Sequence, residues 1–256
     1  MGKIIAVANQ KGGVGKTTTS VNLSAALAEA GKKVLMADLD PQGNTTSGLG
    51  GRLNERNSIY DAMMGRTALK DCIQKTELKK LHLIGADIRL AGAEVELVSV
   101  SDREFYLKKL LSPVRGDYDY IFVDCPPSLS LLTLNALAAA DTVLVPIQCE
   151  YYALEGVTSL MNTIQRVKRS FNPHLEIEGI LLTMLDGRTN LGLQVVDQVK
   201  KHFRKQVFAT MIPRNVRLGE APSHGQPICL YDPKSTGAAA CESLAKEVIA
   251  RNKGKK

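Results

Sequence analysis

The chain has 256 residues, of which 44% are hydrophobic, 23% charged and 5% aromatic, and it contains no tryptophan. This is the composition of an ordinary globular protein that can bury a core without disulfides, and it excludes a disordered chain, a collagen-like fibre and a coiled-coil rod. The five cysteines include no Cys-x-x-Cys pair, so we expect a protein of the reducing cytoplasm.

The net charge of +7 is confined to one part of the chain. Residues 1–185 contain 20 basic and 20 acidic residues, whereas residues 186–256 contain 13 basic and 6 acidic residues. Such an asymmetry points to a polyanionic partner. A solubilising surface with a basic tail at 251–256, which we expect to be flexible, explains the charge equally well, so other features must decide.

Short β-rich runs alternate with helical stretches along the chain, and no repeat or Pro/Gly/Ser-rich linker divides it. Strands are predicted at residues 4–8, 34–37, 81–84, 120–123, 142–147, 179–184 and 207–212, and helices at 18–30, 129–140, 154–170, 191–203 and 238–250. This alternation predicts a single α/β domain over residues 1–256, with a doubly wound, mainly parallel sheet and helices on both faces. Ligands of such sheets bind beyond the carboxyl ends of the strands.

The first predicted strand leads into a glycine-rich turn and then into a helix, with the sequence Lys11-Gly12-Gly13-Val14-Gly15-Lys16-Thr17-Thr18. This is the context of a phosphate-binding loop (P-loop), in which backbone N–H groups and a helix N-terminus surround a phosphate. Lys16 is expected to neutralise the β- and γ-phosphates of a nucleotide, and Thr17 to place its hydroxyl on Mg²⁺. The usual spacing puts a glycine at position 10, where this chain has Gln10, and an additional lysine, Lys11, follows it.

Carboxylates follow two of the predicted strands. Asp124 follows the strand at 120–123 and is expected to face the P-loop, where it can hold Mg²⁺ through water. Asp38 and Asp40 follow the strand at 34–37 and would project the same way if that strand continued. A turn that merely ends the strand is the alternative for residues 38–41. Lysines, Mg²⁺ and one water-orienting carboxylate suffice for phosphoryl transfer, which depends mainly on positioning and charge neutralisation.

Together these segments resemble the ParA/MinD family of ATPases, whose P-loop is a deviant Walker A motif. The resemblance extends from Lys3 to about Ala250 and is carried by the P-loop and four further segments in the same order. These are ADLDPQGN at 37–44, IFVDCPPS at 121–128, PIQCEYYALEG at 146–156 and IPRNVRL at 212–218. The last two segments are similar to the ParA branch in particular.

The resemblance implies roles for individual residues. Lys11 would reach across an ATP-sandwich dimer to the nucleotide of the partner protomer, and Asp40 would position the attacking water with support from Asp38. Pro213 and Asn215 would lie beside the adenine, with Met184 nearby, although Pro213 could equally mark the end of the last strand. The expected site therefore binds ATP and Mg²⁺. Its catalytic residues are Lys11, Lys16 and Asp40, its nucleotide-binding residues are Lys11, Gly12, Gly13, Val14, Gly15, Lys16, Thr17, Thr18, Pro213 and Asn215, and its metal ligands are Thr17 and Asp124.

Basic residues in the last third of the chain favour a DNA partner. Lys200, Lys201, Arg204 and Lys205 fall at i and i+4 spacing on a predicted helix, and like charges in that arrangement destabilise an isolated helix unless an anionic surface neutralises them. A solvated helix face is the alternative. The resemblance adds Arg188 and Arg217 to the same DNA-binding surface. Because no recognition helix or zinc motif is visible, we expect contacts to phosphates and not to bases.

We therefore interpret the chain as an ATP-dependent dimeric switch of the cytoplasm and nucleoid. It would bind double-stranded DNA non-specifically and hydrolyse ATP, stimulated by a ParB-like partner, to segregate or position chromosome or plasmid DNA. The main alternative is a MinD-like membrane-associated ATPase, but the last predicted helix is rich in alanine and lacks Phe and Trp, so we expect no membrane binding. A metabolic kinase or synthetase with a P-loop is a third interpretation, for which no acceptor pocket is visible.

Overall fold

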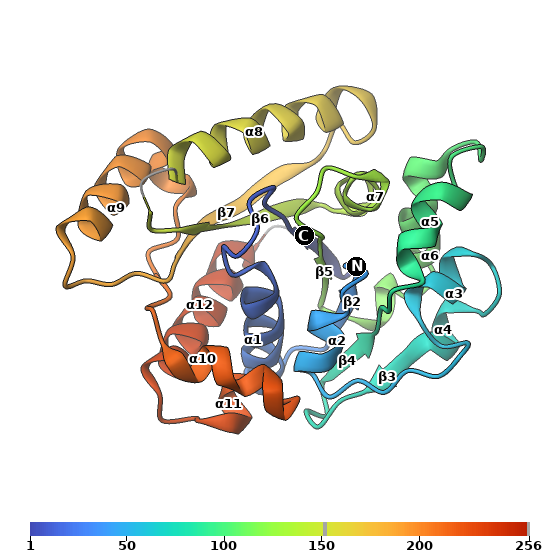
Figure 1. The fold of residues 1–256 in the computed structure, drawn as a ribbon, viewed down its shortest axis with the longest axis horizontal. Helices are drawn as coiled ribbons and strands as arrows, with labels where there is room; N and C mark the ends of the chain where they lie inside the picture. Colours follow the sequence, from blue (N-terminus) through green and yellow to red (C-terminus); the bar gives the residue numbers. More distant parts are fainter. Residues whose placement is uncertain (151–152, 255–256) are drawn as a thin grey trace.

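The computed structural model describes residues 1–150 and 153–254. These residues form a seven-stranded sheet in the order β3-β4-β2-β5-β1-β6-β7, with β3 antiparallel and the other pairs parallel (Figure 1). The doubly wound, mainly parallel sheet predicted from the sequence is thereby confirmed. The strands are β1 (Lys3–Val7), β2 (Val34–Asp38), β3 (Ile73–Lys75), β4 (Leu81–Ile84), β5 (Tyr120–Asp124), β6 (Thr142–Gln148) and β7 (Glu176–Thr183).

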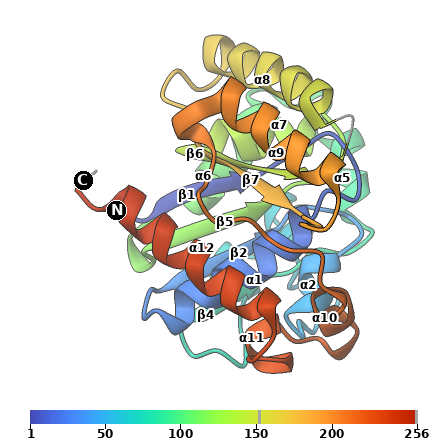
Figure 2. The same ribbon diagram turned by 90° about the vertical axis from the view of Figure 1, so that its left-hand side faces the viewer.

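Helices cover both faces of the sheet (Figures 1 and 2). One face is covered by α1 (Lys16–Glu29), α10 (Val216–Glu220), α11 (Ile228–Tyr231) and α12 (Thr236–Asn252). The other is covered by α3 (Ile59–Met63), α4 (Leu69–Cys72), α5 (Leu90–Glu96), α6 (Tyr106–Leu111), α7 (Leu131–Ala139), α8 (Ala153–Ser170) and α9 (Asn190–Phe203). The short helix α2 (Asn44–Gly48) follows the carboxyl end of β2. Within the described ranges, no helix has the length and hydropathy needed to cross a membrane.

The sheet separates the core into two clusters, and its inner strand β1 contributes side chains to both. Because side chains alternate along a strand, Ile4 and Ala6 pack into the cluster under α3–α9, whereas Ile5 and Val7 pack into the cluster under α1 and α12. β1 pairs with β5 on one side and with β6 on the other. Residues that follow Val7 therefore leave the sheet at the middle of its carboxyl edge, which is where the P-loop begins.

The strand predicted at residues 207–212 is wrong. Val207 forms only an isolated bridge with Ile180, and the segment then runs beside β7 without a continuous ladder. The backbone N–H groups of Ala209 and Thr210 donate to the Glu247 carboxylate of α12, each at 2.9 Å. Phe208 and Ile212 still donate to the carbonyl oxygens of Ile180 and Leu182 in β7, each at 2.9 Å. The Thr210 N–H, which lies between them, is taken by a helix side chain, so no continuous ladder forms. The antiparallel strand β3, which has only three residues, was not predicted.

The end of α9 also differs from the expectation. Arg204 has a φ of 46°, a left-handed conformation that ends the α-helix at Phe203. Arg204 and Lys205 belong to the short 3₁₀ turn that follows. The predicted i and i+4 repulsion along one helix is therefore wrong for these two residues, because they do not share the helical face of Lys200 and Lys201.

A buried carboxylate joins the two ends of the chain to the sheet. Glu178 of β7 accepts hydrogen bonds from Thr142 Oγ1 and Asn252 Nδ2, both at 2.7 Å, and forms an ion pair with Lys3. Its side chain is only 2% exposed. Burial acts to raise the pKa of Glu178, but the hydrogen bond and charge of Lys3, together with the hydrogen bonds from Thr142 and Asn252, hold the pKa below its ordinary value. One carboxylate thus connects β1, β6, β7 and α12.

Replacing this carboxylate should destabilise the fold. We expect Glu178→Ala to lower the free energy of unfolding by about 3 kcal/mol, because it leaves Lys3 in a largely buried position without its counter-charge. The stabilisation is present above the pKa of an unfolded glutamate and is lost as the pH falls through the lower pKa of the folded state. Urea unfolding at pH 7 measures the change. Glu242→Ala is the matched control, since it breaks the exposed pair with Lys246 and should cost only a few tenths of a kcal/mol; equal effects of the two variants would contradict the expectation.

Candidate nucleotide-binding site

The P-loop follows β1 at the carboxyl edge of the sheet and leads into α1. Gly13 and Gly15 have φ values of 73° and 85°, which lie in the left-handed region that glycine adopts without strain. Gly15 is the N-cap of α1, so the unpaired N–H groups of the first helical turn open onto the loop. Loop and helix therefore form the kind of concave, electropositive cradle that binds a phosphate.

The lysine at the start of α1 is buried beneath this loop. Lys16 is only 7% exposed, and its Nζ donates to the Lys11 carbonyl oxygen at 3.1 Å, across the mouth of the loop. Burial lowers the pKa of Lys16, whereas the negative charge of Asp124 acts in the opposite direction. A buried ammonium held by a carbonyl oxygen still has donors to offer to an anion in the loop.

Asp124, at the end of β5, is the centre of a hydroxyl cluster. Its carboxylate accepts hydrogen bonds from Thr17 Oγ1 at 2.8 Å, Ser20 Oγ at 2.8 Å and Thr45 Oγ1 at 2.7 Å. The carboxylate is completely buried, and burial raises its pKa, while the three hydroxyls oppose that rise. Sequence reasoning placed Thr17 beside Asp124 but missed Ser20 and Thr45. The one available signal for Ser20 was its position three residues after Thr17 on the same helical face.

This cluster has the chemistry that Mg²⁺ requires. A threonine hydroxyl and a carboxylate are hard oxygen ligands, and Mg²⁺ keeps several waters while it binds one or two carboxylates and the phosphates of a substrate. Within residues 1–150 and 153–254 there is no group of three or more His, Cys, Asp or Glu side chains that could hold a metal alone. Thr17 and Asp124 therefore fit an ion that arrives together with a nucleotide.

The two aspartates after β2 have different surroundings. The strand ends at Asp38, and Asp38 Oδ1 accepts from the Asp40 N–H at 3.1 Å, so the strand does not continue to Asp40 as the expected common projection required. Asp38 is fully buried and its Oδ2 also accepts from the N–H and the hydroxyl of Thr46, at 2.8 and 2.7 Å. Burial, followed by the nearby charge of Asp124, raises the pKa of Asp38 to about 7. Both carboxylate oxygens of Asp38 are thus hydrogen-bonded to groups of the protein itself.

The carboxylate of Asp40 accepts fewer hydrogen bonds than that of Asp38 among the described residues. Its Oδ1 accepts from the Gln42 N–H at 3.0 Å, the one hydrogen bond to this carboxylate within the described residues. Asp40 is 8% exposed and close enough to Lys16 and Asp124 to influence the pKa of both. Of the two carboxylates, Asp40 has the lone pairs available for a water molecule.

Lys11 lies apart from this buried cluster. Its Nζ is 3.5 Å from Glu150 Oε2, and both side chains are partly exposed, at 39% and 47%. An exposed pair of this kind contributes little to stability and is easily broken. The side chain of Lys11 is therefore free to exchange Glu150 for another anion.

A cavity of about 160 Å³ adjoins the P-loop on the side of α10. Pro213 and Met184 line it, together with Gly15 and Thr18 of the P-loop. Asn215 also lines the cavity, but its carboxamide has partners within the chain. Its Oδ1 caps α10 through the Leu218 N–H at 3.3 Å, and its Nδ2 donates to Thr236 Oγ1 at 2.9 Å. Pro213, Asn215 and Met184, the predicted adenine neighbours, are thus brought together beside the loop.

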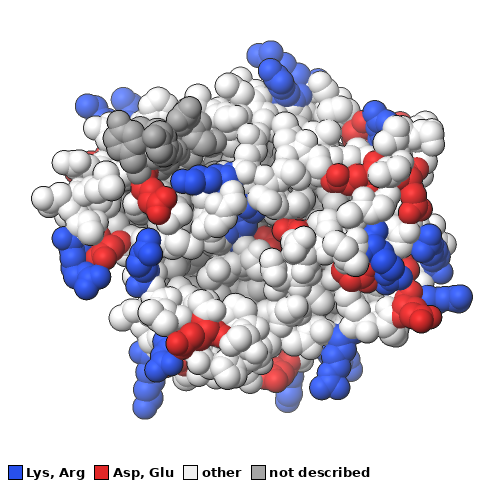
Figure 3. Space-filling model, in the orientation of Figure 1, with Lys and Arg blue, Asp and Glu red and all other residues white. Residues whose placement is uncertain are grey.

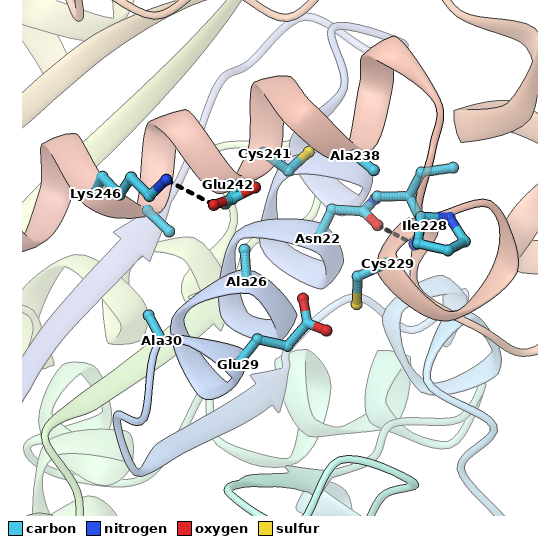
Figure 4. Close-up of a pocket in the computed structure, with 12 residues that line it drawn as sticks. Asn22, Ala26, Glu29, Ala30, Ile228, Cys229, Ala238, Cys241, Glu242 and Lys246 are labelled. Carbon is cyan, nitrogen blue, oxygen red and sulfur yellow. Dashed lines mark hydrogen bonds and ion pairs between the residues drawn. The ribbon is translucent and has the colours of Figure 1, made fainter.

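A larger cavity of about 420 Å³ lies between α1, α11 and α12 (Figure 4). None of the residues predicted to bind nucleotide, metal or DNA lines it. Its polar groups are paired with one another, because Asn22 accepts from the Ile228 N–H at 2.6 Å and Lys246 pairs with Glu242. Burial raises the pKa of Cys229 and of Cys241 to about 12, so these thiols stay protonated at neutral pH.

The cations predicted to bind DNA fall into two groups. Arg188 and Arg217 lie in segments that follow the carboxyl edge of the sheet, and each is paired within the chain, with Asp186 at 2.7 Å and Glu220 at 2.8 Å. Lys200 and Lys201 lie at the far end of α9, a helix about 20 Å long. In the described part of the chain, Lys200, Lys201 and Arg204 form no ion pair. Figure 3 shows Lys and Arg around the rim of the nucleotide face, interspersed with acidic side chains.

Comparison with known proteins places the chain in a family. A family model described as an AAA domain matches residues 2–177. The sporulation initiation inhibitor protein Soj of Bacillus subtilis is 59% identical over 251 residues, which cover 98% of this chain and 99% of that protein. The chromosome partitioning protein ParA of Myxococcus xanthus is 53% identical over 98% of this chain and 89% of its own length.

A solved structure agrees with this assignment. The crystal structure of cobyrinic acid a,c-diamide synthase from Mycobacterium smegmatis, with bound ADP and magnesium, superposes with a TM-score of 0.87 at 38% identity and covers 100% of this chain and 97% of the other. The order of motifs, the P-loop fold and the similarity to Soj and ParA proteins over nearly the full chain lead to one conclusion. The chain belongs to the ParA/Soj family of chromosome-partitioning ATPases.

Proposed function

We propose that this chain is an ATP-dependent dimeric switch that hydrolyses ATP, binds double-stranded DNA non-specifically and segregates or positions chromosome or plasmid DNA. The observation that carries the proposal is the cluster in which Lys16, Thr17, Asp124 and Asp40 meet beneath the P-loop. Such a set of a buried ammonium, a hydroxyl, a metal-type carboxylate and a second carboxylate with free lone pairs is what phosphoryl transfer to water requires.

Each residue of the cluster has a separate task in this proposal. Backbone N–H groups of residues 12–18 and the Lys16 ammonium hold the β- and γ-phosphates of ATP, and the cavity beside Pro213, Asn215 and Met184 takes the adenine. Thr17 and Asp124 hold Mg²⁺, which neutralises phosphate charge when it is bound. Asp40 orients the attacking water and accepts its hydrogen bond, while Asp38 fixes the turn that carries Asp40. Catalysis then consists of positioning and charge neutralisation.

Lys11 gives the switch its dependence on a second protomer. The lysine side chain is partly exposed, and among the described residues Glu150 is its ion-pair partner, so it can leave that partner at little cost. In an ATP-bound dimer it would reach the phosphates of the nucleotide in the facing protomer. Hydrolysis releases the γ-phosphate as inorganic phosphate and leaves ADP with less negative charge to attract the lysine, so the dimer loses stability.

DNA binding and its regulation complete the proposal. The two groups of cations on each protomer, Arg188 with Arg217 and Lys200 with Lys201 and Arg204, would be doubled in the dimer and contact phosphates along the duplex. A ParB-like partner would stimulate hydrolysis and so release the DNA, and the protein would reside on the nucleoid of the cytoplasm. The relative named as a chromosome partitioning protein is 53% identical to this chain, whereas the M. smegmatis synthase is 38% identical, which favours this function over that of a synthase.

A MinD-like membrane function is the alternative. The last helix, α12, does not support it, because its apolar residues Cys241, Leu244, Ala245 and Val248 are buried against the sheet and not available to lipid. Pelleting with anionic lipid vesicles in the presence of ATP distinguishes the two functions, since only the membrane function predicts ATP-dependent pelleting.

The first prediction of this proposed function concerns hydrolysis. Asp40→Ala should bind ATP with near-normal affinity but hydrolyse it at least about 100-fold more slowly, because water positioning is lost while the phosphate cradle remains. Lys16→Ala, in contrast, should abolish binding, because the phosphates lose their buried counter-charge. Equilibrium binding of a fluorescent ATP analogue and phosphate release measure the two effects. Hydrolysis by Asp40→Ala at the unmodified rate would transfer the role to Asp38.

The second prediction concerns the dimer. Lys11→Ala should still bind ATP as a monomer but fail to form the ATP-dependent dimer, as measured by light scattering after size-exclusion chromatography. Glu150→Ala is the matched control, because it breaks the same ion pair from the other side and should leave the dimer intact. A normal ATP-dependent dimer of Lys11→Ala would rule out a lysine that acts across the interface.

The third prediction concerns DNA. Affinity should require ATP, ignore sequence and fall with salt at a slope of about −0.9 per phosphate neutralised. The double variant Arg188→Glu, Arg217→Glu should weaken binding to all duplexes and reduce the salt slope, yet dimerise normally with ATP. Lys200→Glu, Lys201→Glu tests the second group of cations in the same way.

Gel-shift assays over a series of salt concentrations measure affinity and slope together. Lys246→Glu, on the exposed side of α12, is the control and should change neither. Equal affinity with and without ATP would contradict the coupling of DNA binding to the dimer, and unchanged binding by both double variants would place the DNA surface elsewhere.

A further inference from the structure

The P-loop departs from the usual pattern at position 10, where a glycine is replaced by Gln10. The carboxamide of Gln10 contacts α8 through both of its heteroatoms. Gln10 Nε2 donates to Thr163 Oγ1 at 3.0 Å, and Gln10 Oε1 accepts from Ser159 Oγ at 3.1 Å. Ser159 and Thr163 are four residues apart and therefore lie one above the other on the same side of the helix.

The hydrogen-bond pattern fixes the orientation of this carboxamide. Thr163 Oγ1 donates its own hydrogen to the Ser159 carbonyl oxygen at 3.3 Å, so toward Gln10 it can only accept. The NH₂ group of Gln10 must therefore face Thr163, and its oxygen must face Ser159. Neither glycine nor alanine at position 10 could make these two contacts.

The neighbours of Gln10 reach the same part of the chain. Asn9 Nδ2 donates to the Pro146 carbonyl oxygen of β6 at 2.7 Å, and Lys11 pairs with Glu150, just after β6. The amino half of the P-loop is thus attached to the β6–α8 segment, whereas the carboxyl half is attached to Asp124 through Thr17. The two halves of the loop therefore contact different parts of the molecule.

The loop also contains a contact that a phosphate would perturb. Lys16 Nζ donates to the carbonyl oxygen of Lys11, the residue directly after Gln10. An ammonium that turns toward a phosphate weakens its hold on this carbonyl, and the Lys11–Gly12 peptide is then less constrained. That peptide directly follows the one that joins Gln10 to Lys11. Movement at Gln10 reaches Ser159 and Thr163 through the two hydrogen bonds.

α8 is placed to carry such a movement across the molecule. The helix has 18 residues and is therefore about 27 Å long, and it packs on the sheet through a narrow stripe formed by Val157, Leu160, Ile164 and Val167. Its last turn carries Lys168 and Arg169. In Figure 2 this end of α8 lies on the same side of the sheet as the end of α9 that carries Lys200 and Lys201.

We propose that Gln10 is a positioning residue that couples occupancy of the P-loop to α8, and through α8 to the cations at the far ends of α8 and α9. This inference rests on the proposed function, because it assumes that the P-loop binds ATP. It explains the departure from the usual motif. A glycine at position 10 would have no side chain, whereas glutamine forms two hydrogen bonds that connect the P-loop to α8. Two neutral, partly exposed hydrogen bonds stabilise the fold only slightly, which suits a link that must be broken and remade.

Hydrogen exchange of the full chain tests the link, with Mg²⁺ and a non-hydrolysable ATP analogue as the ligand. In the unmodified protein, the analogue should slow exchange at the start of α1 and also in peptides that cover residues 157–170, by at least about fivefold. In Ser159→Ala, Thr163→Val, the response of α1 should persist while the response of α8 falls to near zero. Gln10→Gly, which restores the usual P-loop glycine, should give the same result.

Two further variants separate coupling from a local loss of structure. Asn162→Ala, Gln165→Ala changes two residues of the same helix outside the link and should leave both responses unchanged. Combining Gln10→Gly with Thr163→Val should add nothing to either change alone, because both remove the same interaction. An additive effect would contradict the direct link.

The outcomes distinguish this inference from the proposed function. If α1 and α8 both respond in Gln10→Gly as in the unmodified protein, the coupling role is wrong while nucleotide binding stands. The same holds if α8 never responds although α1 does. If neither α1 nor α8 of the unmodified protein responds, and the analogue does not bind, the nucleotide-binding function itself is overturned and the inference falls with it.

Discussion

The structure depends above all on one buried carboxylate. Asp124 is fully buried at the end of an inner strand, and a charge in that position is costly unless hydrogen bonds compensate for it. Three hydroxyls supply that compensation, two from α1 and one from α2. The same bonds that satisfy Asp124 dock the P-loop helix and the turn with Asp40 against β5. The hydrogen bonds from Thr17, Ser20 and Thr45 therefore do two things at once. They compensate the buried charge of Asp124, and they fix the relative positions of the elements that form the site.

The position of the P-loop and of the aspartates at the strand ends could be predicted from the sequence, because short contiguous motifs mark them. The P-loop is a contiguous pattern between a strand and a helix, and the parallel sheet brings the residues after β1, β2 and β5 to one edge. The partners of the key carboxylates were not predictable in the same way. Serine and threonine occur throughout the chain, and nothing in the sequence marks Thr45 or Thr46 as the ones that α2 presents to Asp124 and Asp38.

The errors in the fold have the same origin. Residues 207–212 have the composition of a strand, but Glu247, almost forty positions later, takes two of the backbone donors. Arg204 looks like the next residue of α9 but adopts a left-handed conformation that ends the helix. In each case a tertiary contact or a single backbone angle overrides a local preference, and the cations of the last third separate into two groups.

The central position of β1 has a consequence for the way the protein is made. Its Lys3 is aligned with Tyr120 of β5, and its Ile5 with Thr142 of β6. At a synthesis rate of about 5–20 residues per second, the ribosome needs roughly 6–23 s to add the residues between Lys3 and Tyr120. During that interval β1, four of whose five residues are apolar, emerges without either neighbour. The nascent chain is therefore prone to aggregate early in its synthesis. We expect chaperones that bind short apolar segments to cover its first residues until β5 and β6 have been synthesised.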